Sequence, residues 1–247
     1  MAREFGLIGK SLVHSFSPTY FFQKFQHLGL RECTYEAFEL EHVRDLPALV
    51  AGHPNLQGLN VTIPYKEQIL PYLDALDSSA ARIGAVNVIQ FDADRRLIGH
   101  NTDYVGFRDS LRRFYPLRGD KATALVLGTG GASKAVEVAL RELDIHYWLV
   151  SRDRLTAGLT YAELTPELMA AHTLIINTTP LGTYPRIEEC PAIPYEALTP
   201  QHYLFDLVYN PSETEFMRRG RAQGAQAQNG FEMLCLQAEA AWAIWNR

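Results

Sequence analysis

Hydrophobic and polar positions follow two different periods along the first half of the chain. Short apolar or alternating runs predict strands, and runs with a helical period predict helices between them. The pattern predicts strands at residues 5–9, 34–40, 58–61, 85–91 and 96–99, and helices at 17–28, 43–51 and 104–114. Ser17 followed by Pro18 is a strong helix start, because serine caps helices and proline suits the first turn. We therefore expect Ser17 to be the N-cap of the first helix.

A polar, turn-rich stretch at residues 116–121 precedes a second series of apolar runs and helical patterns. This series predicts strands at 122–127, 146–150, 173–177 and 203–206, and helices at 132–143, 165–171 and 230–245. Strands that are apolar throughout and alternate with helices are typical of a parallel, doubly wound sheet. We therefore expect an α/β protein of two domains, with the boundary near residues 103–120 and the last helix packed back on the first domain.

Composition and charge narrow the functional classes. The chain has 247 residues, of which 47% are hydrophobic and 21% charged, and its net charge is −5. This length is enough for a large core, and the lack of a basic surplus argues against nucleic-acid binding. The basic cluster Arg218-Arg219-Gly-Arg221 is interpreted as a solvated helix end.

Neither a membrane segment nor a metal site is indicated. No apolar run approaches the ~20 residues of a transmembrane helix, and the first residues are too polar for a signal peptide. Cys33, Cys190 and Cys235 lack the spacing of a zinc site and are typical of small buried side chains in a reducing compartment. We expect a cytoplasmic protein with no metal, no membrane partner and no nucleic-acid partner.

A glycine-rich loop, Gly128-Thr129-Gly130-Gly131-Ala132-Ser133, lies between a predicted strand and a predicted helix. The first glycine permits a tight turn, and Gly130 lets the backbone approach a pyrophosphate. The helix N-terminus then offers unpaired N–H groups and a partial positive charge. Glycines also form plain turns, but this position favours dinucleotide binding.

The end of the next strand indicates which dinucleotide is bound. An acid there would bind the ribose 2′-hydroxyl of NAD, whereas this strand ends in Ser151-Arg152-Asp153-Arg154. Two guanidinium groups favour the 2′-phosphate of NADP, although Asp153 could repel that phosphate, and one arginine could simply cover the adenine or the surface. We expect NADP.

A lysine and an aspartate each follow an apolar run in the first half. Lys66 ends Asn60-Val-Thr-Ile-Pro-Tyr-Lys66, and Asp103 ends Gly99-His-Asn-Thr-Asp103. A lysine at a strand end can stabilise a developing alkoxide and donate a proton to it. An ordinary salt bridge is the alternative. Together with the glycine loop, the pair suggests proton transfer coupled to hydride transfer.

Further polar residues lie at predicted strand ends or inside apolar segments, where their side chains need hydrogen-bond partners. Each alone is more often structural, but their convergence suggests a pocket for a small polyhydroxylated acid. They are Ser15, Ser17, Thr62, Asn87, Tyr209 and Gln237.

Taken together, these segments resemble shikimate dehydrogenases, over essentially the whole chain. The motifs that carry the resemblance are His14-Ser-Phe-Ser-Pro18, Asn60 to Glu67, Gly84-Ala-Val-Asn87, Asn101-Thr-Asp103, Gly128 to Ser133 and Gly230 to Gln237. The family implies a substrate-binding α/β domain at 1–103 together with 230–247, and a Rossmann-type NADP-binding domain at 104–229. It implies NADPH-dependent, reversible reduction of 3-dehydroshikimate to shikimate, in aromatic amino-acid biosynthesis.

The resemblance also implies residue roles. Lys66 and Asp103 match the catalytic pair, and Ser15 and Ser17 the ligands of the substrate carboxylate. Thr62, Lys66, Asn87, Asp103 and Gln237 would surround the other substrate oxygens, with Tyr209 nearby. The cofactor set would be Gly128, Thr129, Gly130, Gly131, Ala132 and Ser133 for the pyrophosphate, Ser151, Arg152 and Arg154 for the 2′-phosphate, and Leu207 and Gly230 beside the nicotinamide.

The chain departs from the family pattern at some positions, and alternatives remain open. Ser151 replaces a frequent Asn, Asp153 a frequent Thr, and Thr183 a frequent Met. One alternative is a quinate/shikimate dehydrogenase with broader cofactor use, although two serines at the carboxylate site favour shikimate. Another is a non-catalytic NADP-sensing homologue, which the presence of both catalytic groups opposes. Lys66 either moves the proton itself or stabilises the oxyanion while water delivers it, and the protein is expected to be a monomer or a homodimer.

Overall fold

The computed structural model describes residues 2–13, 15–116 and 122–247, which form two compact units. The first unit comprises the residues up to Asp103 together with Gln237–Arg247. The second unit comprises Tyr104–Leu236. Helix α5 (Asp103–Phe114) begins where the first unit ends, and helix α9 (Phe231–Trp245) contributes residues to both. His14 and residues 117–121 of the predicted turn-rich stretch at 116–121 lie outside the described residues.

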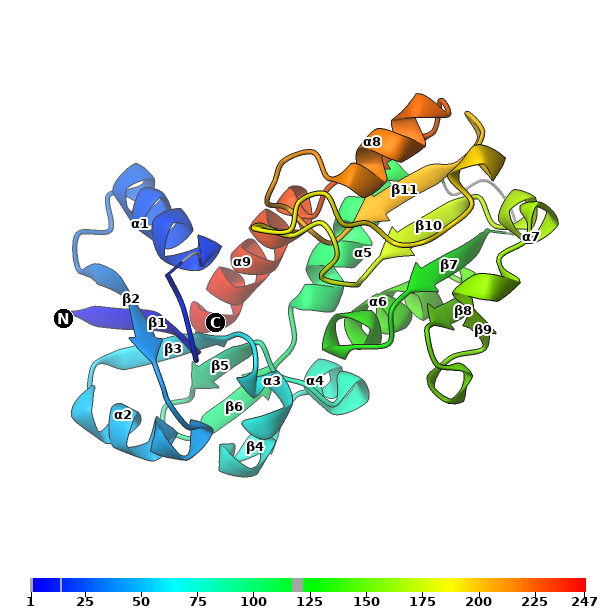
Figure 1. The fold of residues 1–247 in the computed structure, drawn as a ribbon. Coiled ribbons are helices and arrows are strands. Elements are labelled where there is room, and N and C mark those ends of the chain that lie inside the picture. Colours follow the sequence, from blue (N-terminus) through cyan, green and yellow to red (C-terminus); the bar gives the residue numbers. More distant parts are fainter. Residues whose placement is uncertain (1, 14, 117–121) are drawn as a thin grey trace. The chain divides into compact units, whose positions relative to one another are not determined.

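The first unit contains a mixed sheet with the strand order β2-β1-β3-β5-β6-β4 (Figure 1). Strand β1 pairs in parallel with β2 and β3, whereas β5 is antiparallel to both of its neighbours. The strands are β1 (Arg3–Gly9), β2 (Cys33–Glu39), β3 (Leu56–Val61), β4 (Ala75–Leu76), β5 (Val88–Phe91) and β6 (Leu97–His100). The helices are α1 (Phe16–Leu28), α2 (Leu46–Gly52), α3 (Tyr65–Gln68) and α4 (Ser78–Ile83).

Both faces of this sheet are covered by helices. Consecutive strand residues point to opposite faces, so Val88 packs with α1 and the end of α9 while Ile89 packs with α2. Figure 1 shows α1 and α2 on opposite sides of the sheet. The Nε1 of Trp245 donates to the backbone oxygen of Ile89 at 3.0 Å. A Cβ at Gly58 would lie 2.2 Å from that indole nitrogen, so the glycine makes room for the C-terminal helix.

The first helix begins one residue earlier than expected. Helix α1 starts at Phe16, and Ser15, not Ser17, is at the N-cap position, without a side-chain capping bond. Pro18 is accommodated as the third helical residue because the amides of the first turn have no intrahelical partner. The prediction of Ser17 as the N-cap was therefore wrong, and both serines lie at the start of the helix.

The second unit contains a parallel sheet with the order β12-β11-β10-β7-β8-β9. The strands are β7 (Thr123–Leu127), β8 (His146–Ser151), β9 (Leu159–Thr160), β10 (Leu174–Asn177), β11 (Tyr203–Asp206) and β12 (Gln226–Gln228). The helices besides α5 are α6 (Gly131–Glu142), α7 (Pro166–Ala171) and α8 (Glu215–Ala222). This is the strand order of a Rossmann-type dinucleotide-binding fold, with its switch point between β7 and β10. The predicted fold class is confirmed.

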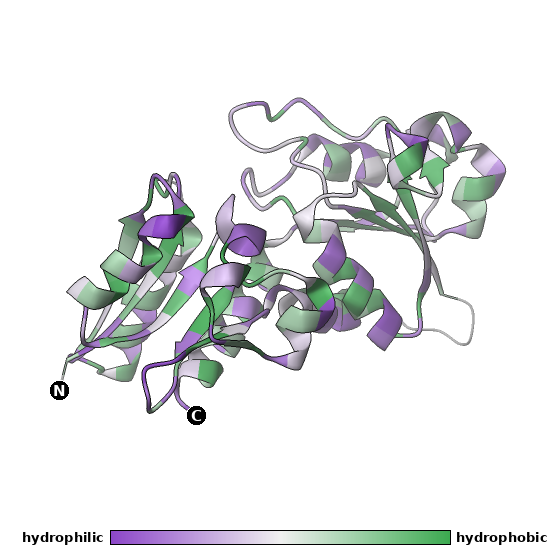
Figure 2. Ribbon diagram, turned by 90° about the horizontal axis from the view of Figure 1, so that it is seen from below, coloured by the Kyte–Doolittle hydropathy of each residue, from purple (hydrophilic) through white to green (hydrophobic). Residues whose placement is uncertain are grey.

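Burial on both faces explains the unbroken apolar runs of these strands. In β7, Ala124 and Val126 pack with α5 and α6, while Leu125 and Leu127 pack with α7 and α8. Figure 2 shows the central strands of this unit as hydrophobic ribbon and the helices as mixtures of both colours. The patterning that predicted a parallel sheet is therefore the consequence of two covered faces.

The hydrophobic pattern did not predict β4, α4, β9, α8 and β12. These elements span between two and eight residues and are too short to show a period, or are strongly polar. The basic cluster lies in α8, where Arg218 and Arg219 both contact Glu215. The interpretation as a solvated helix end is confirmed.

The remaining sequence expectations concern membranes, metals and thiols. Across the described ranges, no helix is long and apolar enough to span a membrane. Within the same ranges, no group of three or more His, Cys, Asp or Glu side chains could hold a metal ion. All three cysteines are thiols; Cys33 is buried, whereas Cys190 and Cys235 are half-buried.

Candidate active site

The structure brings Lys66 and Asp103 together in the first unit. Lys66 is the second residue of α3, and its backbone oxygen accepts a bond from Val86 N at 2.8 Å. Its Nζ donates to Asp103 Oδ2 at 2.7 Å. The two side chains are 33% and 18% exposed, respectively. The ammonium is therefore held by a carboxylate yet remains reachable from solvent.

Asn87 fixes the other side of the carboxylate. This residue is 3% exposed, and its Nδ2 lies 2.8 Å from Asp103 Oδ1 and 3.4 Å from Gln237 Oε1. Its Oδ1 accepts from Thr102 N at 2.7 Å. The predicted residues Lys66, Asn87, Asp103 and Gln237 thus form one hydrogen-bonded set, which we call the Lys66 network.

Asn101 belongs to a motif named in the sequence analysis, but it was not assigned to the site. Its Oδ1 accepts from Asp103 N at 3.0 Å, and its Nδ2 donates to Ala85 O at 2.9 Å. Asn101 is 3% exposed, and a buried amide side chain needs such partners; because it lies in the polar stretch His100 to Asp103, its burial could not be predicted from the sequence. Asn101 holds the backbone of Asp103 where α5 begins.

A second chain of hydrogen bonds reaches the network from α1. Ser17 bonds to the Tyr35 hydroxyl, which donates to Asn60 Oδ1 at 2.7 Å. Asn60 Nδ2 in turn donates to Asn87 O at 3.3 Å. Burial raises the pKa of Tyr35, and the bond from Ser17 opposes this shift. Tyr35 carried no sequence signal, because only the pairing of neighbouring strands brings its hydroxyl to Asn60.

The other predicted substrate residues lie at the ends of other elements. Ser15 lies at the start of α1, and Thr62 directly follows β3, with its amide donating to Ile8 O at 2.9 Å. Tyr209 belongs to the second unit, and burial raises its pKa.

The glycine loop has the backbone geometry that a pyrophosphate site requires. Gly128 has φ +106°, and a Cβ there would lie 2.8 Å from Thr178 Oγ1. A Cβ at Gly130 would meet open space, and the backbone of 130–132 is exposed at the start of α6. Ser133 is buried and donates to Gly130 O at 2.7 Å. The Ser133 amide donates to Gly130 O at 3.0 Å, and the start of a helix at this switch point can receive an anion.

The two arginines after β8 are in different environments. Arg154 forms an ion pair with Glu163, and Asp153 Oδ1 accepts from Leu155 N at 2.9 Å. Arg152 is exposed, and no ion pair is recorded for it among the residues that the structure describes. The Asp153 carboxylate is therefore engaged by its own turn, and Arg152 carries the available positive charge.

Leu207 and Gly230 are in contact in the second unit. A Cβ at Gly230 would lie 2.2 Å from the Leu207 carbonyl oxygen, and Gly230 N donates to Val208 O at 3.1 Å. Leu207 N donates to Asn177 O at 3.0 Å. Only glycine permits this close approach, which joins the segment after β11 to the start of α9.

A buried carboxyl group supports the same segment. Asp206 is 0% exposed and accepts bonds from Asn177, Val208 and Thr214, the last at 2.6 Å. Burial raises the pKa of Asp206 to about 6, although these bonds oppose the shift. The residue was part of a predicted strand but was not expected to organise the loop.

The raised pKa predicts how Asp206 affects stability. The folded protein retains this proton more strongly than the unfolded chain, so the contribution of Asp206 is full below about pH 4 and is lost as pH rises through about 6. Wild type should therefore lose about 2 kcal/mol relative to Asp206→Asn between about pH 4.5 and about pH 7.5. Urea unfolding of both proteins across this range measures the difference, and a pH-independent difference would contradict the raised pKa.

Comparison with known proteins agrees with these motifs. Residues 7–89 match the family model described as the shikimate dehydrogenase substrate binding domain. The chain is 37% identical to the shikimate dehydrogenase (NADP(+)) of Desulforamulus reducens, covering 97% of this chain and 88% of that protein.

Solved structures show the same architecture. Shikimate 5-dehydrogenase from Thermus thermophilus, in complex with NADP(H) and shikimate, is 34% identical, with a TM-score of 0.85 and coverage of 98% of this chain and 93% of that one. Quinate dehydrogenase from Corynebacterium glutamicum, in complex with NAD, is 27% identical, with a TM-score of 0.88 and coverage of 99% and 93%. From the identity and coverage of these relatives, the chain belongs to the shikimate dehydrogenase family.

Proposed function

We propose that this protein is an NADP-dependent shikimate dehydrogenase, which reversibly reduces 3-dehydroshikimate to shikimate in the shikimate pathway. The observation that carries the proposal is the Lys66 network, in which an accessible ammonium is held 2.7 Å from Asp103. Relatives named shikimate dehydrogenase (NADP(+)) support the substrate and the cofactor.

The proposed mechanism assigns the proton to Lys66. Reduction of a ketone requires a hydride at carbon and a proton at oxygen, and bound NADPH supplies the hydride. The Lys66 ammonium donates to the ketone oxygen, stabilises the negative charge that develops there and then releases the proton to it. Asp103 orients the ammonium, and Asn87 holds Asp103 in place.

The substrate roles follow the placement of the polar groups. We assign the substrate carboxylate to Ser15 and Ser17, because a helix N-terminus carries a partial positive charge and both lie at the start of α1. Ring oxygens would contact Thr62, Asn87 and Gln237 beside the catalytic pair, and the family resemblance adds Tyr209 to the proposed substrate residues.

The second unit fits an NADP molecule. Pyrophosphate would lie against the backbone of Gly128, Thr129, Gly130, Gly131, Ala132 and Ser133, where the left-handed turn and the open space at Gly130 provide room. The 2′-phosphate would bind at Ser151, Arg152 and Arg154, and the nicotinamide near Leu207 and Gly230. We infer that the unit of Tyr104–Leu236 binds the cofactor and the other unit the substrate.

Arg152→Ala is expected to raise KM for NADP⁺ by about 20-fold, because one charge-assisted contact to a phosphate is lost. NAD⁺ has no 2′-phosphate, so its KM should change less than about twofold. Steady-state kinetics with each cofactor at saturating shikimate checks this. Equal effects on both cofactors would remove Arg152 from the 2′-phosphate site.

The activity itself is tested with purified protein, shikimate or quinate, and NADP⁺ or NAD⁺. We expect the highest kcat/KM with shikimate and NADP⁺. Preference for quinate would favour the alternative of a broader quinate/shikimate dehydrogenase, and the absence of turnover despite NADP⁺ binding would favour a sensor. We also expect a cytoplasmic monomer or homodimer, which cell fractionation and light scattering would examine.

A further inference from the structure

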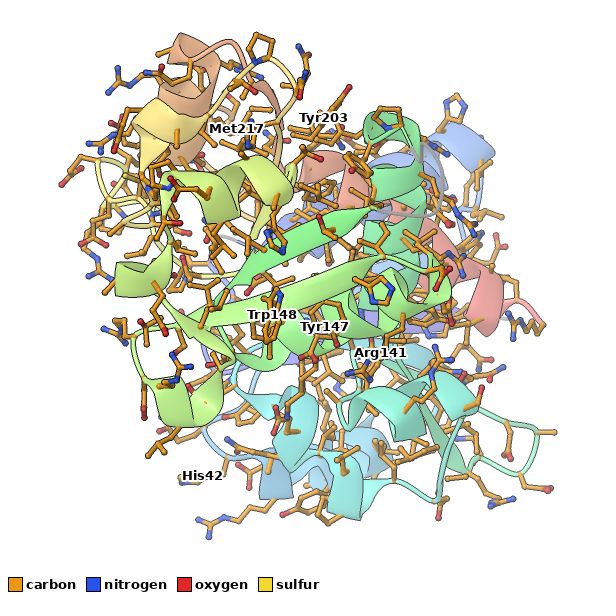
Figure 3. All side chains as sticks on the ribbon, turned by 90° about the vertical axis from the view of Figure 1, so that its right-hand side faces the viewer. His42, Arg141, Tyr147, Trp148, Tyr203 and Met217 are labelled. Atoms are coloured by element: carbon orange, nitrogen blue, oxygen red, sulfur yellow. The ribbon has the colours of Figure 1, made fainter. Side chains whose placement is uncertain are left out.

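The turn that follows β8 is held against the sheet. Strand β9 continues the parallel sheet, with Val150 paired to Leu159 and Ser151 to Thr160. A Cβ at Gly158 would lie 2.6 Å from the ring of Trp148, which is labelled on β8 in Figure 3. The segment from Ser151 to Glu163, which we call the phosphate turn, therefore has a defined path.

This path places Glu163 beside Arg154. Glu163 Oε2 accepts bonds from Thr160 N at 2.8 Å and from Thr160 Oγ1 at 2.9 Å. Its Oε1 contacts Arg154 Nη1. The bonds from Thr160 and then Arg154 lower the pKa of Glu163, so the carboxylate is charged at neutral pH. The capping bonds fix this charge toward the arginine.

Glu163 changes the charge balance of the phosphate turn. Arg152 and Arg154 are positive, while Asp153 and Glu163 are negative. The sequence predicted NADP because of these two arginines, and Asp153 was the single opposing charge that it indicated. Because the return of the chain at β9 adds a second carboxylate, the turn is close to neutral overall. A neutral turn discriminates weakly between a ligand with a phosphate dianion and one without it.

We propose that Glu163 limits the preference of this protein for NADP over NAD by pairing with Arg154, so that this guanidinium group is not free to bind the 2′-phosphate. The inference rests on the proposed function, because it assumes that the phosphate turn receives this group. Arg152 then provides most of the attraction, and Arg154 contributes little until its partner is neutralised.

Glu163→Gln tests the proposal directly. Glutamine retains an oxygen that can accept from Thr160, so the cap is preserved, while the charge is removed. The ratio of kcat/KM for NADP⁺ to that for NAD⁺ should rise about fivefold, through a lower KM for NADP⁺. Both side chains of the pair are more than a third exposed, so added salt should reduce the gain.

Two further variants separate charge pairing from other effects. Glu167→Gln removes the same charge from an exposed position in α7 and should leave the cofactor ratio within about twofold of wild type. In an Arg154→Ala background, Glu163→Gln should raise the ratio of kcat/KM for NADP⁺ to that for NAD⁺ by less than about twofold. The guanidinium group that Glu163→Gln would otherwise release is absent from this variant. A fivefold gain that persists in this background would overturn the pairing.

The outcomes distinguish this inference from the proposed function. An unchanged cofactor ratio in Glu163→Gln, with wild-type shikimate turnover, would overturn the role of Glu163 alone. If wild type did not oxidise shikimate with either cofactor, the proposed function would fail. In that case, calorimetry would still measure the binding of NADP⁺ and NAD⁺ to the same variants. Tighter binding of NADP⁺ alone in Glu163→Gln would support the role of Glu163 in cofactor preference, and any other result would overturn it.

Discussion

Lys66→Ala is expected to lower kcat for shikimate oxidation by about a thousandfold, because the group that exchanges the proton and stabilises the oxyanion is removed. Binding of shikimate should weaken by less than about tenfold, since Ser15, Ser17 and Asn87 remain to hold other oxygens. Steady-state kinetics and calorimetric binding of shikimate measure the two effects separately.

Lys10→Ala is the matched control for this variant. Lys10 is in the same unit, has a side chain 55% exposed and forms a surface ion pair with Glu41 at 3.1 Å. Surface pairs contribute little to stability, so both kcat and shikimate binding should stay near wild type. A Lys66→Ala protein with near-normal kcat would remove this lysine from the chemistry.

Asp103→Asn is expected to lower kcat/KM for shikimate by about a hundredfold. Asparagine has almost the same shape and can still accept from Asn87, but it no longer balances the ammonium held at 2.7 Å. The lysine then loses its orientation, which the reaction requires. The comparison is Asp109→Asn, which removes the charge from a half-buried pair with Arg108 away from the Lys66 network and should change kcat/KM by less than about twofold.

The double variant tests whether the two residues act as a unit. If Asp103 works through Lys66, then Lys66→Ala with Asp103→Asn should be little worse than Lys66→Ala alone. Additive losses would show that Asp103 acts independently, for example as a ligand of a substrate hydroxyl.

Much of the fold could be predicted because buried and exposed positions produce a regular pattern of hydrophobic and polar residues in the sequence. The central strands β7, β10 and β11 of the second unit are mostly apolar since both of their faces are covered, and the glycine loop lies where a strand meets a helix. The edge strands β4, β9 and β12 were not readable, because two or three residues cannot show a period. The start of α1 was displaced since Pro18 is tolerated at any position of the first turn.

The candidate site was readable where a polar residue interrupts an apolar run. Lys66, Asn87 and Asp103 carried this signal, and the structure joins them. Tyr35 and Glu163 did not, because their importance depends on a partner that only strand pairing or a turn brings near. For the same reason, the two arginines after β8 looked equivalent in the sequence but differ in the structure.

The most direct test follows the absorbance of NADPH as purified protein is mixed with shikimate and NADP⁺. The account predicts formation of NADPH by wild type and by Lys10→Ala, loss of most of this rate in Lys66→Ala, and a lower kcat/KM with quinate. Absence of NADPH formation from shikimate, in protein that is folded and binds NADP⁺, would contradict it.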